Sequence, residues 1–433
     1  MPNLNSVKGA NAFLLGNFME KHLDSKIRNL QQMWKEYLTP AEPYQLDLWL
    51  TEFFKKHKKY GSKDRKFYRD VFFKLLRSHG LYVYLIDKNS AKQIFSKINT
   101  SSDLIDYLRS CDLEPLVKLM YGENTPNLSD TIKRLDLTSD VDIAIASSTS
   151  LNTASKIKVR LEGLNTDESH NFFNYLTFQP RAWVRLDRDI KIEDLQKEAD
   201  KAGLEFSIEN DQPYFIQNPQ IKNLSFFKKG ALDFQDLASQ KLTHGLPEGF
   251  SPKSIWDVCA GAGGKSLSLR KQFPKTRIFS SDIREHKINK LKEKAKKLGI
   301  TSIKTFVHDA TYSFPVNLQK DFKVPSFDLV VIDAPCSSSG VIRRSPDTKL
   351  RLEQENISEI AKLQEKILDS AKESLNPGGI IVYSTCSLFK EENEDIASKF
   401  VSAHSGFTII SQGIVGSPFY DSDTMFKAII KKD

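Results

Sequence analysis

Short apolar segments alternate with amphipathic helices through the second half of the chain. The apolar segments have the length of buried strands and read, in order, SIWDV, RIFSSD, SIKTFV, FDLVVID and GGIIVYSTC, starting at residue 254. Helices separate them, and the one after RIFSSD places Ile288, Leu291, Ala295 and Leu298 on one face before it ends at Gly299. Such alternation is typical of a parallel sheet covered by helices on both faces. The pattern predicts an α/β, Rossmann-like doubly wound domain over residues 231–433.

The first part of the chain has only the helical period. Ile27, Leu30, Trp34 and Leu38 recur at steps of three and four residues until Pro40 and Pro43 end the pattern. A second apolar run follows at residues 46–54, and a third helix places Phe67, Val71 and Leu75 on its buried face with Gly80 as its expected C-cap. The sequence predicts an all-helical domain over residues 1–150.

Between these two regions the pattern changes twice. The stretch SSTSLNTAS, residues 147–155, is small and polar, which is typical of a flexible connection and places the first domain boundary near residue 150. Strands are then expected at AWVRLD, LEFSIE and PYFIQ, with a helix at IEDLQKEADKAG. This order predicts a small α/β, RRM-like subdomain over residues 151–230, although it contains no RNP signature.

Composition and charge narrow the possible partners. The net charge of +8 is compatible with a polyanion such as RNA, because Lys and Arg side chains neutralise phosphates. The third helix presents a basic face, which fits either an RNA-facing surface or an ordinary solvated one; its members are Lys63, Arg65, Lys66, Arg69, Lys74 and Arg77. No run of about 18 apolar residues and no secretory signal is found, so a cytoplasmic protein is expected. The four cysteines lack metal-ligand spacing, and neither a zinc site nor a disulfide framework is expected.

A glycine-rich turn follows the first strand of the doubly wound region. In CAGAGGKS, Gly261, Gly263 and Gly264 let the backbone turn tightly at a helix N-terminus and approach a cofactor. A phosphate-binding P-loop would need glycine at Cys259, so a nucleotide triphosphatase is discounted. The next strand ends in Asp282, where a carboxylate can accept hydrogen bonds from ribose hydroxyls. The sequence therefore predicts a cofactor that contains a nucleoside.

Three more functional side chains follow later strands. Asp309 comes after SIKTFV, where it could accept a hydrogen bond from an adenine amino group or simply form a turn. Cys336 and Cys386 come after the strands FDLVVID and GGIIVYST, at the sheet edge where such folds bind ligands. Two buried cysteines are ordinarily core residues. Carbon 5 of cytosine, however, is a poor nucleophile until a thiolate adds to carbon 6, and a second group is then useful for elimination.

At these motifs the sequence resembles the RNA (cytosine-5-)-methyltransferase family, of the RsmB/Sun and Nop2/Sun type. The matching segments are GALDFQDLASQ, DVCAGAGGKSLSL, SSDI, VHDA, FDLVVIDAPCSSSGVIRRSPDTKLR, LNPGGIIVYSTCSLFKEEN and DSDTMFKAII. They depart from the family in Gly261-Ala262, where many members have Ala-Pro, and in His308, where glycine is common. The resemblance implies a class I methyltransferase fold and S-adenosylmethionine as the cofactor.

The resemblance also implies roles for individual residues. Cys386 is the expected nucleophile, and Cys336 assists release of the methylated base. The expected cofactor loop comprises Cys259, Ala260, Gly261, Ala262, Gly263, Gly264 and Lys265, with Asp282 at the ribose and Asp309 at the adenine. Asp333 is expected between cofactor and cytosine, with Lys265 as its electrostatic anchor. Arg343 and Arg344 are expected to meet RNA phosphate, an ordinary surface salt bridge being the alternative.

The substrate implied by the resemblance is a cytosine of 16S ribosomal RNA, unpaired or flipped so that it reaches the cysteines. Bacterial members begin with a NusB-like helical domain, which the helices here match in type and length. Transfer RNA or another ribosomal site is the alternative within the same chemistry. A small-molecule methyltransferase would not need the two cysteines or the basic extension, and a non-catalytic ribosome-assembly factor would not need reactive thiols. A monomer without a bound metal is expected.

Overall fold

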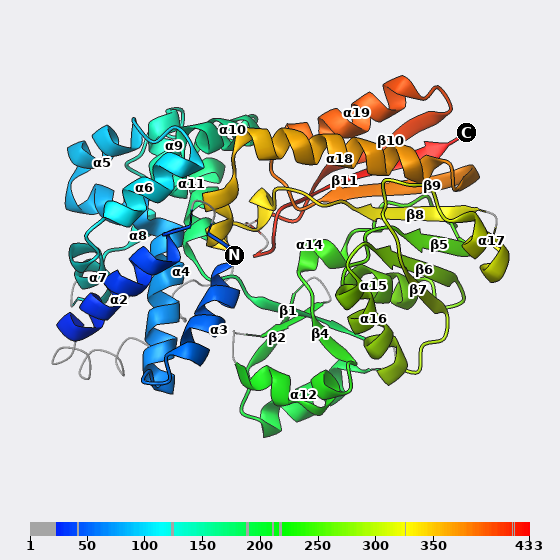
Figure 1. Ribbon diagram of the computed structural model, residues 1–433, viewed down its shortest axis with the longest axis horizontal. Coiled ribbons are helices and arrows are strands. Elements are labelled where there is room, and N and C mark those ends of the chain that lie inside the picture. Colours follow the sequence, from blue (N-terminus) through cyan, green and yellow to red (C-terminus); the bar gives the residue numbers. More distant parts are fainter. Residues whose placement is uncertain are drawn as a thin grey trace. The chain divides into compact units, whose positions relative to one another are not determined.

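The computed structural model describes residues 23–433 except 41–42, 123–124, 188–189, 210–211, 216–218, 325, 418 and 420 (Figure 1). Residues 1–22, where no secretory signal is expected, and the end of the strand expected at PYFIQ lie outside the described residues. Two compact units are present. The helical unit comprises Met1–Phe178 and Ile342–Glu353, and the α/β unit comprises Gln179–Val341 and Gln354–Asp433. No helix among the described residues is both long and apolar enough to cross a membrane.

The helical unit packs around buried aromatic side chains. Trp34 and Phe72 have ring centroids 5.2 Å apart, and Tyr37 packs edge-on against Phe72 at 5.9 Å. The predicted helix at residues 27–38 is confirmed, and the apolar run at residues 46–54 also forms a helix. The helices are α2 (Leu23–Tyr37), α3 (Leu46–Lys56), α4 (Ser62–Ile86), α5 (Lys88–Phe95), α6 (Ser101–Ser110), α7 (Glu114–Tyr121), α8 (Leu128–Ile132), α9 (Asp140–Ser147), α10 (Leu151–Leu161) and α11 (Thr166–Thr177).

Helix α4 does not end at Gly80, so the predicted C-cap is wrong. The helix continues to Ile86 through a kink at Ser78, whose φ and ψ are −139° and 17°. A Cβ on Gly80 would lie 2.5 Å from the carbonyl oxygen of Ile145 in α9. Glycine is required at this position because α9 approaches the backbone of α4 closely.

The small polar segment at residues 147–155 is not a flexible connection. Residues 147–150 are buried, and α10 begins at Leu151. Ser147 donates its hydroxyl to the carbonyl oxygen of Ile143 at 2.7 Å, and Ser150 accepts a hydrogen bond from the backbone N–H of Thr153 as the cap of α10. The serines were misread because helix caps and linkers favour the same residue types.

A segment from the second half of the chain completes the helical unit. Residues 342–353 leave the α/β unit after Val341 and return to it at Gln354. Within this segment Lys349 is buried and donates to the carbonyl oxygens of Leu76, Arg77 and Ser147, at 2.9, 3.1 and 2.6 Å. Burial, with a smaller effect of Arg77, lowers the pKa of Lys349 to about 7.

The α/β unit begins with a small antiparallel sheet of order β2-β3-β1-β4. Its core comprises the apolar face of α12 and the strands, with Val184, Leu195 and Phe215 fully buried. The last strand, β4, pairs with β1 through Leu232 and Leu186, and so extends this sheet beyond the predicted boundary at residue 230. The elements are β1 (Ala182–Leu186), α12 (Ile192–Lys201), β2 (Phe206–Glu209), β3 (Gln212–Phe215), α13 (Ser225–Lys228), β4 (Leu232–Phe234) and α14 (Leu237–Gln240).

The large sheet has seven strands in the order β10-β11-β9-β8-β5-β6-β7. Strands β7, β6, β5, β8 and β9 are mutually parallel, while β11 runs antiparallel to both of its neighbours. The five predicted strands are all present. The elements are β5 (Ser254–Asp257), α15 (Gly264–Gln272), β6 (Arg277–Asp282), α16 (Glu285–Lys297), β7 (Ile303–Val307), α17 (Val316–Phe322), β8 (Phe327–Asp333), α18 (Gln354–Lys372), β9 (Leu375–Thr385), α19 (Glu394–Ala403), β10 (Phe407–Val415) and β11 (Met425–Lys432).

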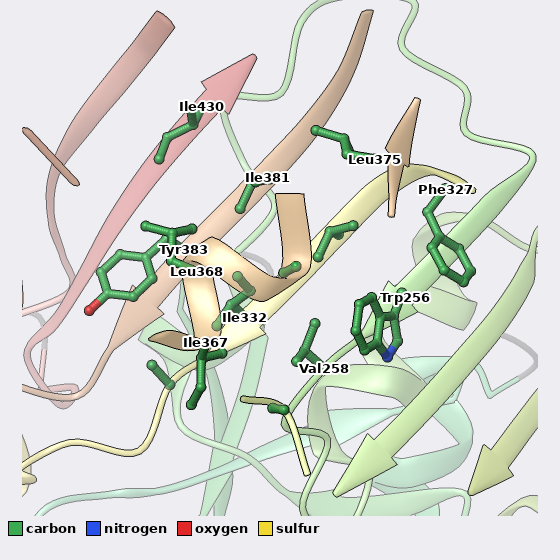
Figure 2. Packing of buried hydrophobic residues seen from close by; sticks show 14 of the residues in the cluster. Trp256, Val258, Phe327, Ile332, Ile367, Leu368, Leu375, Ile381, Tyr383 and Ile430 are labelled. Carbon is green, nitrogen blue, oxygen red and sulfur yellow. The ribbon is translucent and has the colours of Figure 1, made fainter. Parts of the chain in front are cut away.

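Apolar side chains fill both faces of the large sheet. On one face Trp256, Phe327 and Tyr383 pack against Ile367 and Leu368 of α18 (Figure 2). On the other face a second cluster joins strand residues to α15 and α16. Its members include Ile255, Leu267, Leu269, Ile278, Leu291, Val331 and Val382. Helices therefore cover both faces, and the predicted α/β doubly wound fold with a small α/β sheet and an N-terminal helical region is confirmed.

Candidate active site

The functional side chains gather where the parallel strands end. Strand β5 lies between β6 and β8, and the chain order reverses there, since β6 and β7 follow on one side and β8 and β9 on the other. The carboxyl ends of such strands border the crevice in which doubly wound sheets bind ligands. The glycine turn follows β5, Asp282 ends β6, and the two cysteines follow β8 and β9.

The glycine turn has the backbone that its sequence predicts. Gly261 and Gly263 have φ of +55° and +87°, which favours glycine, and Gly263 caps α15. A Cβ on Gly263 would lie 2.2 Å from the Leu291 side chain, whereas a Cβ on Gly261 would meet nothing within 4 Å. Gly263 thus permits close packing of α16, and Gly261 leaves open space at the turn.

Asp282 anchors this turn from the end of β6. Its Oδ2 accepts the backbone N–H of Gly261 at 2.9 Å, and its Oδ1 accepts the backbone N–H of Arg284 at 2.9 Å. The Arg284 guanidinium also donates to both oxygens, at 2.9 and 3.0 Å. Burial opposes ionisation of Asp282, but the hydrogen bonds from Arg284 outweigh burial and lower its pKa. A buried, ionised carboxylate at this place is suited to accept hydroxyl donors.

Asp309, after β7, forms a local turn. Its Oδ1 accepts hydrogen bonds from the backbone N–H and the hydroxyl of Thr311, at 2.9 and 2.8 Å, and these bonds lower the pKa of Asp309. The turn-forming role anticipated from the sequence is therefore present. The turn uses the Oδ1 atom of Asp309, and no hydrogen bond from the described residues reaches its Oδ2 atom.

Lys265 and Asp333 form an ion pair between the turn and the end of β8. The Lys265 Nζ lies 2.6 Å from the Asp333 Oδ2, and only 13% of the Lys265 side chain is exposed. Burial opposes the lysine's charge, but Asp333 outweighs burial and raises the pKa of Lys265. The predicted electrostatic partnership of the two residues is present in the structure.

The two cysteines lie side by side. Because β8 and β9 are parallel neighbours, with Asp333 opposite Ser384, the loops that follow them meet at one edge. The Sγ atoms of Cys336 and Cys386 are 3.0 Å apart, and the backbone N–H of Cys386 donates to the Cys336 Sγ at 3.2 Å. The Cys386 Sγ lies 3.5 Å from the Ser338 hydroxyl. Both thiols are partly buried.

The surroundings of the two thiols differ. The hydrogen bond from Cys336 lowers the pKa of Cys386, and the positive charge of Lys265 acts in the same direction. The pKa of Cys336 is raised well above its usual value by its hydrogen bond to Cys386 and by burial, with a contribution from the charge of Glu392. These opposite shifts favour the proton on Cys336 and the negative charge on Cys386. Burial raises the pKa of Cys259, which begins the glycine turn.

Two buried carboxyl groups near the site were not recognised in the sequence. Asp257 ends β5, where its Oδ2 accepts the Ser266 hydroxyl at 2.6 Å, and its burial raises its pKa to about 7. Glu392, in the 3-10 helix Lys390–Glu392, is fully buried behind the cysteines. Its position inside the matched segment LFKEEN was a signal, but an acidic run reads as a solvated surface unless its burial is known.

The basic residues predicted to meet RNA are placed differently from one another. Arg343 is 4% exposed and donates through Nε to the carbonyl oxygen of Phe178, inside the helical unit, while Arg344 is exposed. In α4, Arg77 is also buried and donates to the carbonyl oxygen of Arg343 at 2.7 Å. Arg69 forms an ion pair with Asp47, and Lys74 lies 3.0 Å from Asp70. The described basic face is therefore partly neutralised, and Arg77 points inward.

Comparison with known proteins agrees with this geometry. Residues 250–420 match the family model described as 16S rRNA methyltransferase RsmB/F. The ribosomal RNA small subunit methyltransferase B of Klebsiella pneumoniae is 33% identical over 248 residues, which cover 55% of each chain. The enzyme of the same name from Yersinia pestis is 30% identical over 266 residues, covering 59% of this chain and 60% of its relative. The chain thus spans little more than half the length of the curated relatives it matches.

Solved structures share the fold at lower identity. The crystal structure of PH0851 has a TM-score of 0.68 at 21% identity and covers 94% of this chain and 98% of its own. The structure of NSun6 from Pyrococcus horikoshii with SFG has a TM-score of 0.53 at 18% identity and covers 64% of this chain and 97% of its own. These likenesses extend the agreement from the motifs to the architecture. Residues 250–420, which contain both cysteines, thus match the RsmB/F family of 16S rRNA methyltransferases, and the solved structures share the fold of the α/β unit.

Proposed function

We propose that this protein transfers a methyl group from S-adenosylmethionine to carbon 5 of a cytosine in 16S ribosomal RNA. The observation that supports this most is the pair of thiols 3.0 Å apart at adjoining strand ends, one favoured as thiolate and the other as thiol. A methyltransferase that acts on a more reactive atom would have no use for this pair. A ribosomal RNA substrate would place the enzyme in the cytoplasm.

The residues after β5 and β6 fit the proposed cofactor. The open space beyond Gly261 and the donors at the start of α15 suit a close approach of the methionine part. Asp282 would accept the ribose hydroxyls, in competition with Arg284, and Asp309 would offer its remaining carboxylate oxygen to the adenine amino group. Cys259 to Lys265 would line the turn. When bound, S-adenosylmethionine supplies the methyl group.

The cysteines divide the reaction between them. The Cys386 thiolate adds to carbon 6 of the cytosine, which makes carbon 5 nucleophilic enough to take the methyl group. Cys336, once its own proton has gone to solvent, accepts the carbon 5 proton, the bonding pair of that proton re-forms the 5,6 double bond, and the bond from carbon 6 to sulfur breaks with its electron pair returning to Cys386 as a thiolate. Cys336 assists this last step. Once Cys386 has become an uncharged thioether, the main cause that holds the proton on Cys336 is gone, so Cys336 can exchange a proton.

Asp333 and Lys265 would orient the base. The Asp333 carboxylate can accept a hydrogen bond from the amino group of cytosine, while Lys265 holds that carboxylate in place from 2.6 Å away. Uracil presents a carbonyl oxygen at the same position and would be repelled by the carboxylate. The ion pair thereby selects cytosine.

The RNA must reach the site with its target base unstacked. Exposed lysines of the helical unit, together with Arg344 after the Cys336 loop, would contact phosphates rather than bases, which positions the RNA without reading its sequence. The helical unit is therefore the part of the chain that would select 16S ribosomal RNA over transfer RNA or another ribosomal site.

Covalent trapping tests the chemistry and the role of each cysteine. Cys336→Ala and Cys386→Ala proteins are incubated with 16S ribosomal RNA and S-adenosylmethionine and analysed on denaturing gels. Cys336→Ala should accumulate a protein–RNA adduct because release is slowed, and Cys386→Ala should form none. The opposite pattern would reverse the two roles, and no adduct in either variant would count against covalent catalysis.

A further inference from the structure

A buried carboxylate joins the loops that follow the two cysteines. The Glu392 Oε1 accepts the backbone N–H of Ser337, the residue after Cys336, at 2.7 Å, and its Oε2 accepts the Ser337 hydroxyl at 2.5 Å. The hydroxyl of Ser387, the residue after Cys386, also donates to Oε2. One side chain is thus hydrogen-bonded to both of the loops that follow the cysteines.

Hydrogen bonds and burial hold the Glu392 side chain in one position. Its side chain is 0% exposed, and Gln364 of α18 donates a further hydrogen bond to Oε1 at 3.2 Å. The backbone of Glu392 is fixed as well, since its carbonyl oxygen accepts the Tyr383 hydroxyl at 2.6 Å. A carboxylate held in this way fixes the distance between the two turns, and hence between the two sulfur atoms.

The charge of Glu392 has no partner of opposite sign among the described residues. Its recorded donors are the backbone N–H and hydroxyl of Ser337, the hydroxyl of Ser387 and the amide of Gln364, all of them neutral. Asp333, the other carboxylate beside the cysteines, is paired with Lys265 at 2.6 Å. Glu392 is therefore a carboxylate beside the thiol pair with which no cation among the described residues forms an ion pair.

The charged and titratable groups around the pair are arranged unequally. Lys265 and Asp333 interact with Cys386, whereas Glu392 interacts with Cys336. Two other titratable groups lie close to these residues. Asp257 interacts with Lys265. Tyr383, whose pKa is raised by burial, interacts with Cys336 and with Glu365 of α18. On the Cys386 side the negative charge of Asp333, which raises the pKa of Cys386, is opposed by Lys265, whereas on the Cys336 side no cation among the described residues pairs with Glu392. This difference favours a proton on Cys336 and a thiolate at Cys386.

We propose, resting on the function proposed above, that Glu392 is a positioning residue that sets the spacing of the two thiols and keeps their shared proton on Cys336. By this means it makes Cys386, rather than Cys336, the attacking sulfur. The sequence alone could not order the two cysteines, and this carboxylate supplies a physical reason for the order.

Alkylation of the full-length protein, without RNA or cofactor, tests the proposal. Trace iodoacetamide is added between pH 6 and 9, and the initial labelling rates of Cys386 and Cys336 are measured separately by peptide mass spectrometry. The wild type should label at Cys386 first. In Glu392→Gln the amide oxygen can still accept from the backbone N–H of Ser337 and from Gln364. The amide N–H groups can donate to the hydroxyls of Ser337 and Ser387, which can rotate to accept. The substitution therefore removes the negative charge and keeps the hydrogen bonds.

The ratio of Cys336 to Cys386 labelling at pH 7.5 should rise on the order of tenfold in Glu392→Gln. Asp395→Asn makes the same change in net charge at an exposed position of α19 and should leave the ratio unchanged. If Glu392→Gln labels like the wild type, Glu392 is only structural and the proposal fails. Should Glu392→Gln not fold, Glu392→Asp, which withdraws the charge from Ser337, should give a smaller rise, and an unchanged ratio would overturn the proposal.

This experiment does not require methyl transfer. If the wild type labels at Cys386 first and Glu392→Gln shifts the labelling, the positioning role stands even when no RNA is methylated. If RNA is methylated but the labelling does not shift, the proposed function stands and the role of Glu392 falls.

Discussion

Replacing Lys349 with methionine should change how the stability of the helical unit depends on pH. The Lys349 ammonium lies in the interior, where it donates to the carbonyl oxygens of Leu76, Arg77 and Ser147. The carbonyls of Leu76 and Arg77 are available because α4 is kinked at Ser78, and Ser147 is the last residue of α9. A cation suits these carbonyls, but its burial has a large desolvation cost.

The size of this pH effect follows from the lowered pKa of Lys349. Burial lowers the pKa of Lys349 from 10.5 to about 7, so between these values the unfolded chain binds more protons than the folded one. The free energy of unfolding contributed by this group must then rise with pH in that window, by about 2 kcal/mol between pH 7 and pH 9. Methionine does not titrate. The stability lost on Lys349→Met should therefore be about 2 kcal/mol larger at pH 9 than at pH 7.

Hydrogen exchange followed by mass spectrometry measures this difference in the full chain. Peptides from α4 and α9 report on the helical unit, and peptides from β8 serve as an internal reference. Comparing variant and wild type at the same pH cancels the intrinsic exchange rate. Lys97→Met, at an exposed position, is the matched control and should show no pH-dependent difference. A difference between Lys349→Met and wild type that stays constant from pH 7 to 9 would refute the reasoning.

Three further predictions concern the α/β unit. The raised pKa of Asp257, about 7, means that its contribution to the free energy of unfolding is present below pH 4 and is lost as the pH rises through 7. Urea titrations at pH 5 and 8 should show that Asp257→Asn lacks a decrease in this free energy of about 3 kcal/mol, and a decrease equal to that of the wild type would contradict the prediction. Lys265→Met should raise the pKa of Cys386, so that its alkylation needs a higher pH, and an unshifted profile would show that Lys265 does not act on the thiol. Gly340→Ala should destabilise the loop after Cys336, because a Cβ would lie 2.0 Å from the carbonyl oxygen of Thr424. A melting temperature of the variant within about 1 °C of that of the wild type would argue against this contact.

The period of apolar residues was sufficient to predict the five parallel strands of the large sheet, whereas β10 and β11 were not predicted. The central strands β5, β6, β8 and β9 are largely buried and so read as continuous apolar runs, which is the strongest signal a parallel sheet gives, while β10 is exposed or half-buried. The glycine turn and both cysteines could be placed as well, because the carboxyl ends of parallel strands meet at one edge. The structure adds that Cys336 and Cys386 are in direct contact.

Three other misread features depend on contacts between distant parts of the chain. Gly80 was read as a helix end because its need for glycine arises from the backbone of α9, 65 residues later in the sequence. Arg343 was read as a surface residue because nothing local shows that residues 342–353 belong to the helical unit. Glu392 was passed over because an acidic segment is ordinarily exposed, and only the fold reveals its four donors.

Analysis of the product nucleoside tests the central claim most directly. The purified protein is incubated with unmodified 16S ribosomal RNA and methyl-labelled S-adenosylmethionine, and the RNA is digested and examined by liquid chromatography and mass spectrometry. The account predicts labelled 5-methylcytidine that is absent when Cys386→Ala replaces the wild type. A labelled nucleoside methylated at any other atom, or 5-methylcytidine that still forms with Cys386→Ala, would contradict it.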